Sequence, residues 1–164
     1  SLIGEGRTRV PASPQAVWDI LLDPKALAKV IPGCQELQAV GANAYHADVI
    51  MGVGPVRGLF EANVALRDLV EPKSAVLIGD VTGPLGSGGG TGHVTLEPDG
   101  DGTLVNYRYE VNVSGKVASV GGRMLDGAAR ILIGQFFNAL VRQTSGDTRA
   151  SLWKRLLRKL GLGK

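Results

Sequence analysis

The chain has 164 residues, enough for one domain with a sizeable core, and its single cysteine excludes an internal disulfide. Its 44% hydrophobic residues and 24 glycines predict a globular protein with many turns between strands. Residues 149–164 carry six cations and no acid, which leaves 12 cations against 15 acids in the rest of the chain. A mildly acidic body argues against a broad nucleic-acid-binding face, so no nucleic-acid partner is expected.

The N-terminal segment predicts one strand and two short helices. Residues 2–11 are expected to form the strand. Ser13 and Asp23 are each followed by proline, the start signal of a helix, and a Pro-Gly turn at residues 32–33 ends the second helix. The start of the chain lacks the apolar core of a signal peptide, and no uninterrupted apolar run approaches the roughly 18 residues of a membrane-spanning helix.

About six antiparallel strands are expected next. The clearest alternation places Phe60, Ala62 and Val64 on the inner face of a strand. Residues 83–92 are rich in glycine but lead into a strand rather than a helix, so we interpret them as a flexible loop or bulged edge strand and not as a phosphate-binding loop. The other strands are expected at residues 35–40, 45–51, 75–81, 94–97 and 103–113.

Residues 115–143 contain no proline and predict one long helix. Its expected apolar stripe is Val117, Val120, Met124, Ala128, Ile131, Leu132, Phe136 and Leu140. Gly121, Gly127 and Gly134 lie near this stripe, although glycine costs about 1 kcal/mol relative to alanine inside a helix. Two interpretations remain open: the glycines allow close packing, or they leave a cavity beneath the helix.

The element order predicts an α+β fold in which a curved antiparallel meander is covered by the long helix. Residues 1–146 are expected to form the ligand-binding domain and residues 147–164 a tail. A curved sheet that grips a helix can enclose a small-molecule site. The residues expected to line this site are apolar or aromatic: Leu27, Ile31, Phe60, Tyr107, Tyr109, Met124, Ala128 and Phe136. For each residue alone, a place in an ordinary core is the simpler interpretation. The two tyrosine hydroxyls are expected to be available to a carbonyl oxygen of a ligand.

The chain has few residues of the types that catalyse reactions. His46 and His93 are expected to face away from the core, and no spacing resembles a zinc or iron site, so we expect neither a metal nor a cofactor. Cys34 is interpreted as a buried structural thiol rather than a nucleophile. Glu61 and Asp68 occupy outward or turn positions and are expected to be solvated. The sequence therefore predicts a protein that is not an enzyme.

The tail predicts a helix with a basic face and an apolar face. Such a segment, with an interfacial tryptophan, is typical of a helix that lies in a membrane surface, and about 15 Å of helix is too short to span a bilayer. The alternative is a helix docked on its own domain or on a partner, which would not need so many cations. Residues 145–148 are expected to form a flexible tether. The predicted membrane-binding residues are Leu152, Trp153, Lys154, Arg155, Leu156, Leu157, Arg158, Lys159 and Leu160.

Several stretches of residues 3–143 together resemble the CoxG-like family of carbon monoxide dehydrogenase subunits, a branch of the START-like helix-grip (SRPBCC) superfamily. They are Val17-Trp18, Ile31-Pro32-Gly33-Cys34, Gly54-Pro55-Val56-Arg57-Gly58-Leu59-Phe60 and the segment 115–123. The resemblance implies a helix-grip fold of about seven strands and an accessory protein of a molybdenum hydroxylase. It also implies placement of that enzyme at the membrane and, in some members, transport of a quinone.

We therefore expect an accessory protein with three partners: a hydrophobic small molecule such as a quinone, molybdenum hydroxylase subunits, and the membrane surface. The expected location is cytoplasmic, peripheral on the inner face of the cell membrane. Two alternatives stay open: an enzyme of the same fold that acts on a small apolar substrate, and an assembly factor without a ligand.

Overall fold

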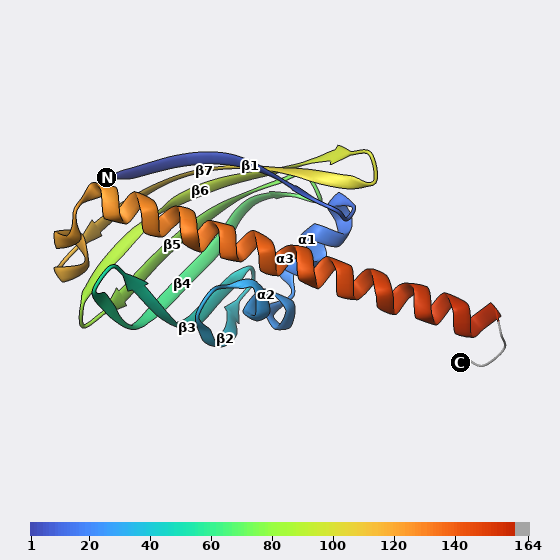
Figure 1. The fold of residues 1–164 in the computed structure, drawn as a ribbon, viewed down its shortest axis with the longest axis horizontal. Coiled ribbons are helices and arrows are strands. Elements are labelled where there is room, and N and C mark those ends of the chain that lie inside the picture. The colour runs from blue at the N-terminus through green and yellow to red at the C-terminus, as the bar shows by residue number, and fades with distance from the viewer. Residues whose placement is uncertain (160–164) are drawn as a thin grey trace.

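The computed structural model describes the backbone of residues 1–159 and the side chains of residues 1–144. Seven strands form one antiparallel sheet in the order β1-β7-β6-β5-β4-β3-β2, and the long helix α3 lies across one face of it (Figure 1). The strands are β1 (Leu2–Val10), β2 (Cys34–Gly41), β3 (Ala44–Val53), β4 (Val56–Val70), β5 (Ser74–Gly83), β6 (Gly86–Asp99) and β7 (Gly102–Ser114). The helices are α1 (Pro14–Leu22), α2 (Pro24–Val30), the short 3₁₀ helix η1 (Lys116–Val120) and α3 (Gly122–Lys159).

Both short helices begin at the positions that the sequence predicts. The Ser13 hydroxyl accepts a hydrogen bond from Ala16 N at 3.2 Å, and the Asp23 carboxylate accepts one from Lys25 N at 3.1 Å. Each side chain satisfies a backbone N–H that has no partner within its own helix, and a proline follows each cap. The predicted α+β fold is confirmed, with two short helices after the first strand and a long C-terminal helix.

The sheet is a meander closed by its first strand. From β2 to β7 each strand pairs with the next one along the chain, whereas β1 pairs with β7, so that Leu2 lies opposite Val111. The main hydrophobic core lies where α1 and α3 pack on the sheet, and it includes Val17, Trp18 and Leu140. Helix α1 therefore does not cover the middle of the sheet, which lies under α3.

The glycine-rich segment is an interior strand, so its prediction as a flexible loop or edge is wrong. Residues 86–92 belong to β6, which pairs with β5 on one side and β7 on the other. Backbone hydrogen bonds form this ladder and need no side chains. Glycine also allows a close approach of the two backbones here, because a Cβ at Gly90 would overlap the carbonyl oxygen of Glu110.

The long helix starts later than predicted, and only part of the predicted apolar stripe is buried. Gly121, at φ +93°, separates η1 from α3, so the helix does not run from residue 115. Met124 and Ile131 of the predicted stripe are 42% and 63% exposed, whereas Leu140 of the same stripe is buried, as is Phe137, which the stripe omits. The stripe is therefore wrong at Met124 and Ile131. Apolar residues lie on more than one side of this helix, and by length and composition alone residues 122–144 could cross a membrane.

The predicted role of the helix glycines is also wrong. Gly134 is exposed and Gly127 is half-buried, and a Cβ at either position would meet no atom within 4 Å. Neither glycine faces the sheet, so they neither allow close packing nor create the space beneath the helix. We therefore expect Gly127→Leu to leave that space open.

The tail is continuous with α3 in its backbone. The helix runs without a break to Lys159 and projects past the sheet (Figure 1), so the predicted tether at residues 145–148 does not interrupt it. The residues predicted to bind the membrane, Leu152 to Leu160, lie outside the part of the chain whose side chains are described. Their apolar and basic faces therefore remain a prediction.

Two glycines of β1 give space to two tyrosines of β7. Gly4 lies opposite Tyr109 in the strand register and Gly6 lies opposite Tyr107, and a Cβ at either glycine would overlap the facing tyrosine ring. The Tyr107 ring is also packed on Phe137 of α3, with ring centroids 5.4 Å apart. The ring is thus held between β1 and α3.

We expect Gly6→Ala to destabilise the fold, because the new Cβ would lie 2.5 Å from Tyr107 Cζ while Phe137 restricts the movement of the ring. Overpacking of this kind costs about 1–3 kcal/mol, or about 3 °C of Tm per kcal/mol for a domain of this size. Thermal denaturation measures the change. Gly41→Ala is the control, because its Cβ would meet its nearest neighbour at an ordinary 3.8 Å. Adding Tyr107→Leu should recover most of the loss; an unchanged Tm for Gly6→Ala alone would contradict the argument.

Candidate functional site

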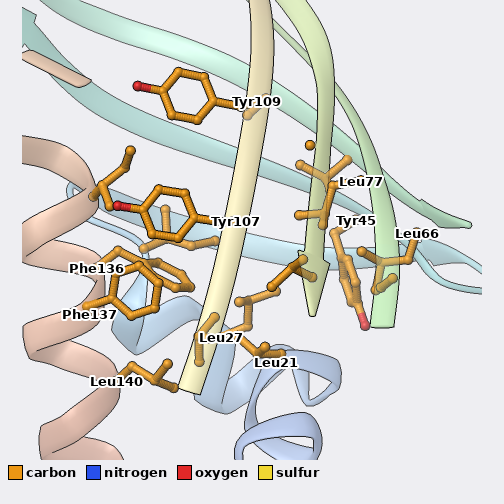
Figure 2. Close-up of a pocket in the computed structure, with 18 of the residues that line it drawn as sticks. Leu21, Leu27, Tyr45, Leu66, Leu77, Tyr107, Tyr109, Phe136, Phe137 and Leu140 are labelled. Carbon is orange, nitrogen blue, oxygen red and sulfur yellow. The ribbon is translucent and has the colours of Figure 1, made fainter. Parts of the chain in front are cut away.

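A cavity of about 500 Å³ lies between the sheet and α3. This volume is within the range of small-molecule sites. Figure 2 shows its walls: Phe136, Phe137 and Leu140 of α3 on one side, Leu77 and Leu66 of the sheet on the other, and Leu21 and Leu27 of the short helices at one end. The lining is almost wholly apolar, so the cavity favours a hydrophobic occupant.

The strands supply the cavity wall by simple alternation. In β3, Tyr45, Ala47 and Val49 line the cavity, and in β4 the lining residues include Ala62, Val64 and Leu66. Successive side chains of a strand point to opposite faces, so the intervening polar residues lie on the outer face of the sheet. The inner faces of these two strands are those that the sequence predicts.

The structure brings together five of the eight residues predicted for the site: Leu27, Ile31, Tyr107, Tyr109 and Phe136 line the cavity. The other three do not. Phe60 is buried beside Gly83, at the turn between β5 and β6. Met124 packs over the turn at Gly54, and Ala128 is half-buried outside the lining. Met124 and Ala128 were included because they belong to the predicted stripe, of which only the later residues Leu132, Phe136 and Leu140 line the cavity.

Phe137 is the main lining residue that sequence reasoning missed. It contacts Tyr107 in a stacked arrangement and Phe136 edge-on, both at centroid distances of 5.4 Å. A signal was available, because Ile133, Phe137, Leu140 and Thr144 recur at spacings of four, three and four. All four are buried or half-buried, and the first three line the cavity.

The hydroxyl groups of Tyr107 and Tyr109 lie against β1, whereas the sequence predicted that they would be available to a ligand. The ends of the Tyr107 and Tyr109 rings lie over Gly6 and Gly4 of β1, and the lining remains apolar. Burial raises the pKa of the Tyr109 phenol, and the Asp126 carboxylate adds to the increase. Tyr45 donates its hydroxyl hydrogen bond to the carbonyl oxygen of Leu22 at 3.1 Å. Burial also raises the pKa of the Tyr45 phenol, so Tyr45 and Tyr109 remain protonated at neutral pH. All three tyrosines offer a ligand aromatic surface.

No imidazole, carboxylate or amine of the described side chains is directed into the cavity. His93 and Arg108 are exposed residues that alternate with the lining residues of β6 and β7, so they contribute to the wall through their backbone. General acid–base catalysis requires a titratable group within hydrogen-bonding reach of the substrate. The described side chains thus offer no general acid or base to an occupant of the cavity.

Cys34 is half-buried rather than buried, but its environment suits a structural thiol. The Sγ atom donates a weak hydrogen bond to Glu36 O at 3.6 Å, and burial raises the pKa of the thiol. The nearby Asp48 carboxylate raises this pKa further, because it disfavours the thiolate. A reactive cysteine has the opposite property, a lowered pKa.

We expect iodoacetamide to alkylate Cys34 more slowly than a free cysteine at pH 8. The thiolate is the reacting form, and a raised pKa lowers its population at a given pH. The rate should continue to rise with pH beyond the point where free cysteine levels off. Mass spectrometry of samples quenched at successive times measures the alkylation rate of Cys34, the only cysteine of the chain. A rate plateau at or below pH 8 would contradict this expectation.

The comparisons with known proteins agree with the fold and identify the family. The family that matches residues 6–145 is CoxG, described as a subunit of carbon monoxide dehydrogenase. A conserved protein from Geobacillus kaustophilus is 33% identical in sequence, with a TM-score of 0.85 over 88% of this chain and 96% of its own. No curated protein sequence matches significantly.

More distant structures share the fold alone. A START superfamily protein from Mycobacterium smegmatis has a TM-score of 0.69 at 16% identity and covers 89% of this chain and 99% of its own. The Zhui aromatase/cyclase from Streptomyces sp. R1128 has a TM-score of 0.65 at 16% identity, covering 91% of this chain and 96% of its own. The START-like fold is therefore shown, and the family match covers nearly all of the folded body: the chain belongs to the CoxG family of carbon monoxide dehydrogenase subunits.

Proposed function

We propose that this protein is a non-enzymatic accessory protein that binds a quinone in the cavity and brings a carbon monoxide dehydrogenase-type molybdenum hydroxylase to the membrane. Membership of the CoxG family implies an accessory role beside carbon monoxide dehydrogenase. The observation that carries the ligand proposal is the apolar cavity of about 500 Å³ under α3. A quinone ring with an apolar side chain is a ligand of suitable chemistry for such a space, because its burial removes hydrophobic surface from water.

The aromatic wall supports a planar ligand. Tyr107, Phe136 and Phe137 line the cavity and present ring faces and edges close to one another. A quinone ring can pack on such surfaces with offset or edge-on geometry. Hydrophobic packing therefore provides the affinity, and few hydrogen bonds are required.

The membrane part of the proposal depends on the sequence of the tail. Four cations between residues 154 and 159, together with leucines and Trp153, suit a helix attached to an anionic membrane surface. An inner-face, cytoplasmic location follows from this proposal, because that leaflet carries anionic lipids. A protein that holds a quinone at this surface would exchange it with the bilayer.

A second candidate is an enzyme of the same fold, since the Zhui aromatase/cyclase shares it. The absence of imidazole and carboxylate groups directed into the cavity, among the side chains described, favours the binding function.

Extraction of the purified protein with an organic solvent tests whether a quinone is bound. An organic extract should show quinone absorbance and a quinone mass, in proportion to the protein. An extract with no hydrophobic small molecule, together with no uptake of added quinone, would leave the assembly-factor alternative. Chemical conversion of an added apolar compound would favour the enzyme.

A further inference from the structure

A polar cluster on the outer face of the sheet lies apart from the cavity. His46 and Asp48 are two residues apart in β3, so both point away from the cavity that Tyr45, Ala47 and Val49 line. Glu61 of β4 lies directly opposite Asp48 in the strand register. One ligand atom of each of the three side chains lies within 4.8 Å of the others. Sequence spacing did not indicate this cluster, because the pairing of β3 with β4 creates it.

Hydrogen bonds orient the imidazole of His46. Asn63 Nδ2 donates to Asp80 Oδ1 at 3.1 Å, and the Oδ1 atom of Asn63 lies 2.8 Å from His46 Nδ1. An amide oxygen can only accept, so Nδ1 carries the proton of the neutral ring and Nε2 carries the lone pair. Nε2 faces Asp48 Oδ1 at 3.9 Å, too far for a hydrogen bond. Two electron-donating atoms thus face each other across a gap.

The carboxylates around this gap lack cationic partners of their own. Glu36, Asp48 and Glu61 lie side by side across β2, β3 and β4, because Asp48 is opposite both of the others. Among the side chains described, no lysine or arginine forms an ion pair with any of them; the one contact of this kind is between His46 and Asp48. Like charges directly opposite one another destabilise a sheet, and a bound cation would relieve that repulsion.

The geometry suits a metal ion of the zinc type. Imidazole nitrogen and carboxylate oxygen bind Zn²⁺ at about 2.0–2.2 Å, so two ligand atoms of one tetrahedral ion lie about 3.4 Å apart. The three ligand atoms lie within 4.8 Å of one another, and rotation of the half-exposed Asp48 and exposed Glu61 side chains would bring them closer. An imidazole ligand favours zinc or a similar transition metal over Mg²⁺ or Ca²⁺. The Asn63 hydrogen bond to the second ring nitrogen is a typical support for a metal-binding histidine.

We propose that His46 Nε2, Asp48 and Glu61 bind one divalent transition-metal ion on the outer face of the sheet, with water completing its coordination. The ion would join β3 to β4 and neutralise the row of carboxylates. Asn63 is a positioning residue in this site, since it holds the ring without touching the metal.

Isothermal titration calorimetry of the untagged full chain with Zn²⁺, and visible absorption of added Co²⁺, test the proposal. We expect one-to-one binding that His46→Gln and Glu61→Gln each abolish. Asn63→Ala should weaken it about 10–100-fold, the effect typical of an outer hydrogen-bond partner. His93→Gln is the matched control, because it removes the other histidine, an exposed residue of β6, and should leave binding unchanged.

Cys34→Ser should also leave the affinity unchanged. Four results would overturn the assignment: no binding at millimolar metal, equal binding by His46→Gln, equal loss with His93→Gln, or loss of affinity in Cys34→Ser, which would place the metal on the thiol. All the substituted side chains are exposed or half-buried, so circular dichroism should show each variant folded.

Discussion

Ala62→Phe is expected to weaken quinone binding at least tenfold, about 1.4 kcal/mol. Ala62 lines the cavity from β4, so a phenyl ring at this position occupies the space that the proposed ligand needs. Filling an existing void removes no packing contacts, so the Tm should hold or rise. Quenching of Trp18 fluorescence by a short-chain quinone measures the affinity, because Trp18 also lines the cavity. The second tryptophan, Trp153, is replaced by Phe throughout to leave one emitter.

The control for this experiment is Ala65→Phe. The substitution is the same and lies three residues further along β4, but Ala65 is outside the cavity lining, opposite Ala44 and Ile78 in the sheet register. It should leave quinone affinity unchanged. The ligand proposal fails if Ala62→Phe binds as well as the parent protein, or if both variants lose binding equally while folded.

Replacing Lys154, Arg155, Arg158 and Lys159 by Gln is expected to weaken binding to anionic liposomes about a thousandfold at low ionic strength. Each cation near an anionic surface contributes roughly 1 kcal/mol, so four contribute about 4 kcal/mol. Most of the salt dependence should disappear with the charges, since screening acts on the electrostatic part. Co-sedimentation with vesicles of mixed neutral and anionic lipid measures both quantities. Leu156→Asp should weaken binding even at low salt, because it places a charge on the apolar face.

A variant with four body cations changed to Gln is the matched control. Lys25, Lys29, Lys73 and Lys116 are exposed, and their replacement changes the net charge by the same amount. Its vesicle binding should stay close to that of the parent. Deletion of residues 151–164 should abolish binding and leave a folded body. The membrane proposal fails if the deleted form sediments as well as the full chain, or if both Gln variants lose binding equally.

The order of the elements follows from local sequence signals. Ser13 and Asp23 cap helices because their side chains accept bonds from nearby backbone N–H groups, an interaction that needs no tertiary contact. Alternation in β3 and β4 likewise determined which side chains face inward, because the period of two is a property of the strand. The fold class and the inner faces of these strands were therefore predictable from the chain alone.

Tertiary structure decided the features that depend on distant partners. Apolar residues lie on more than one side of α3, so the predicted stripe joined the exposed Ile131 to the buried Leu140 and omitted Phe137; packing on Tyr107 decided which side is buried. The glycines of β6 look like a loop until two neighbouring strands pair with them. The pairing of β3 with β4 likewise places Glu61 beside His46 and Asp48. Local signals thus determine which elements form, whereas the cavity lining and the outer polar cluster arise only when separate elements meet.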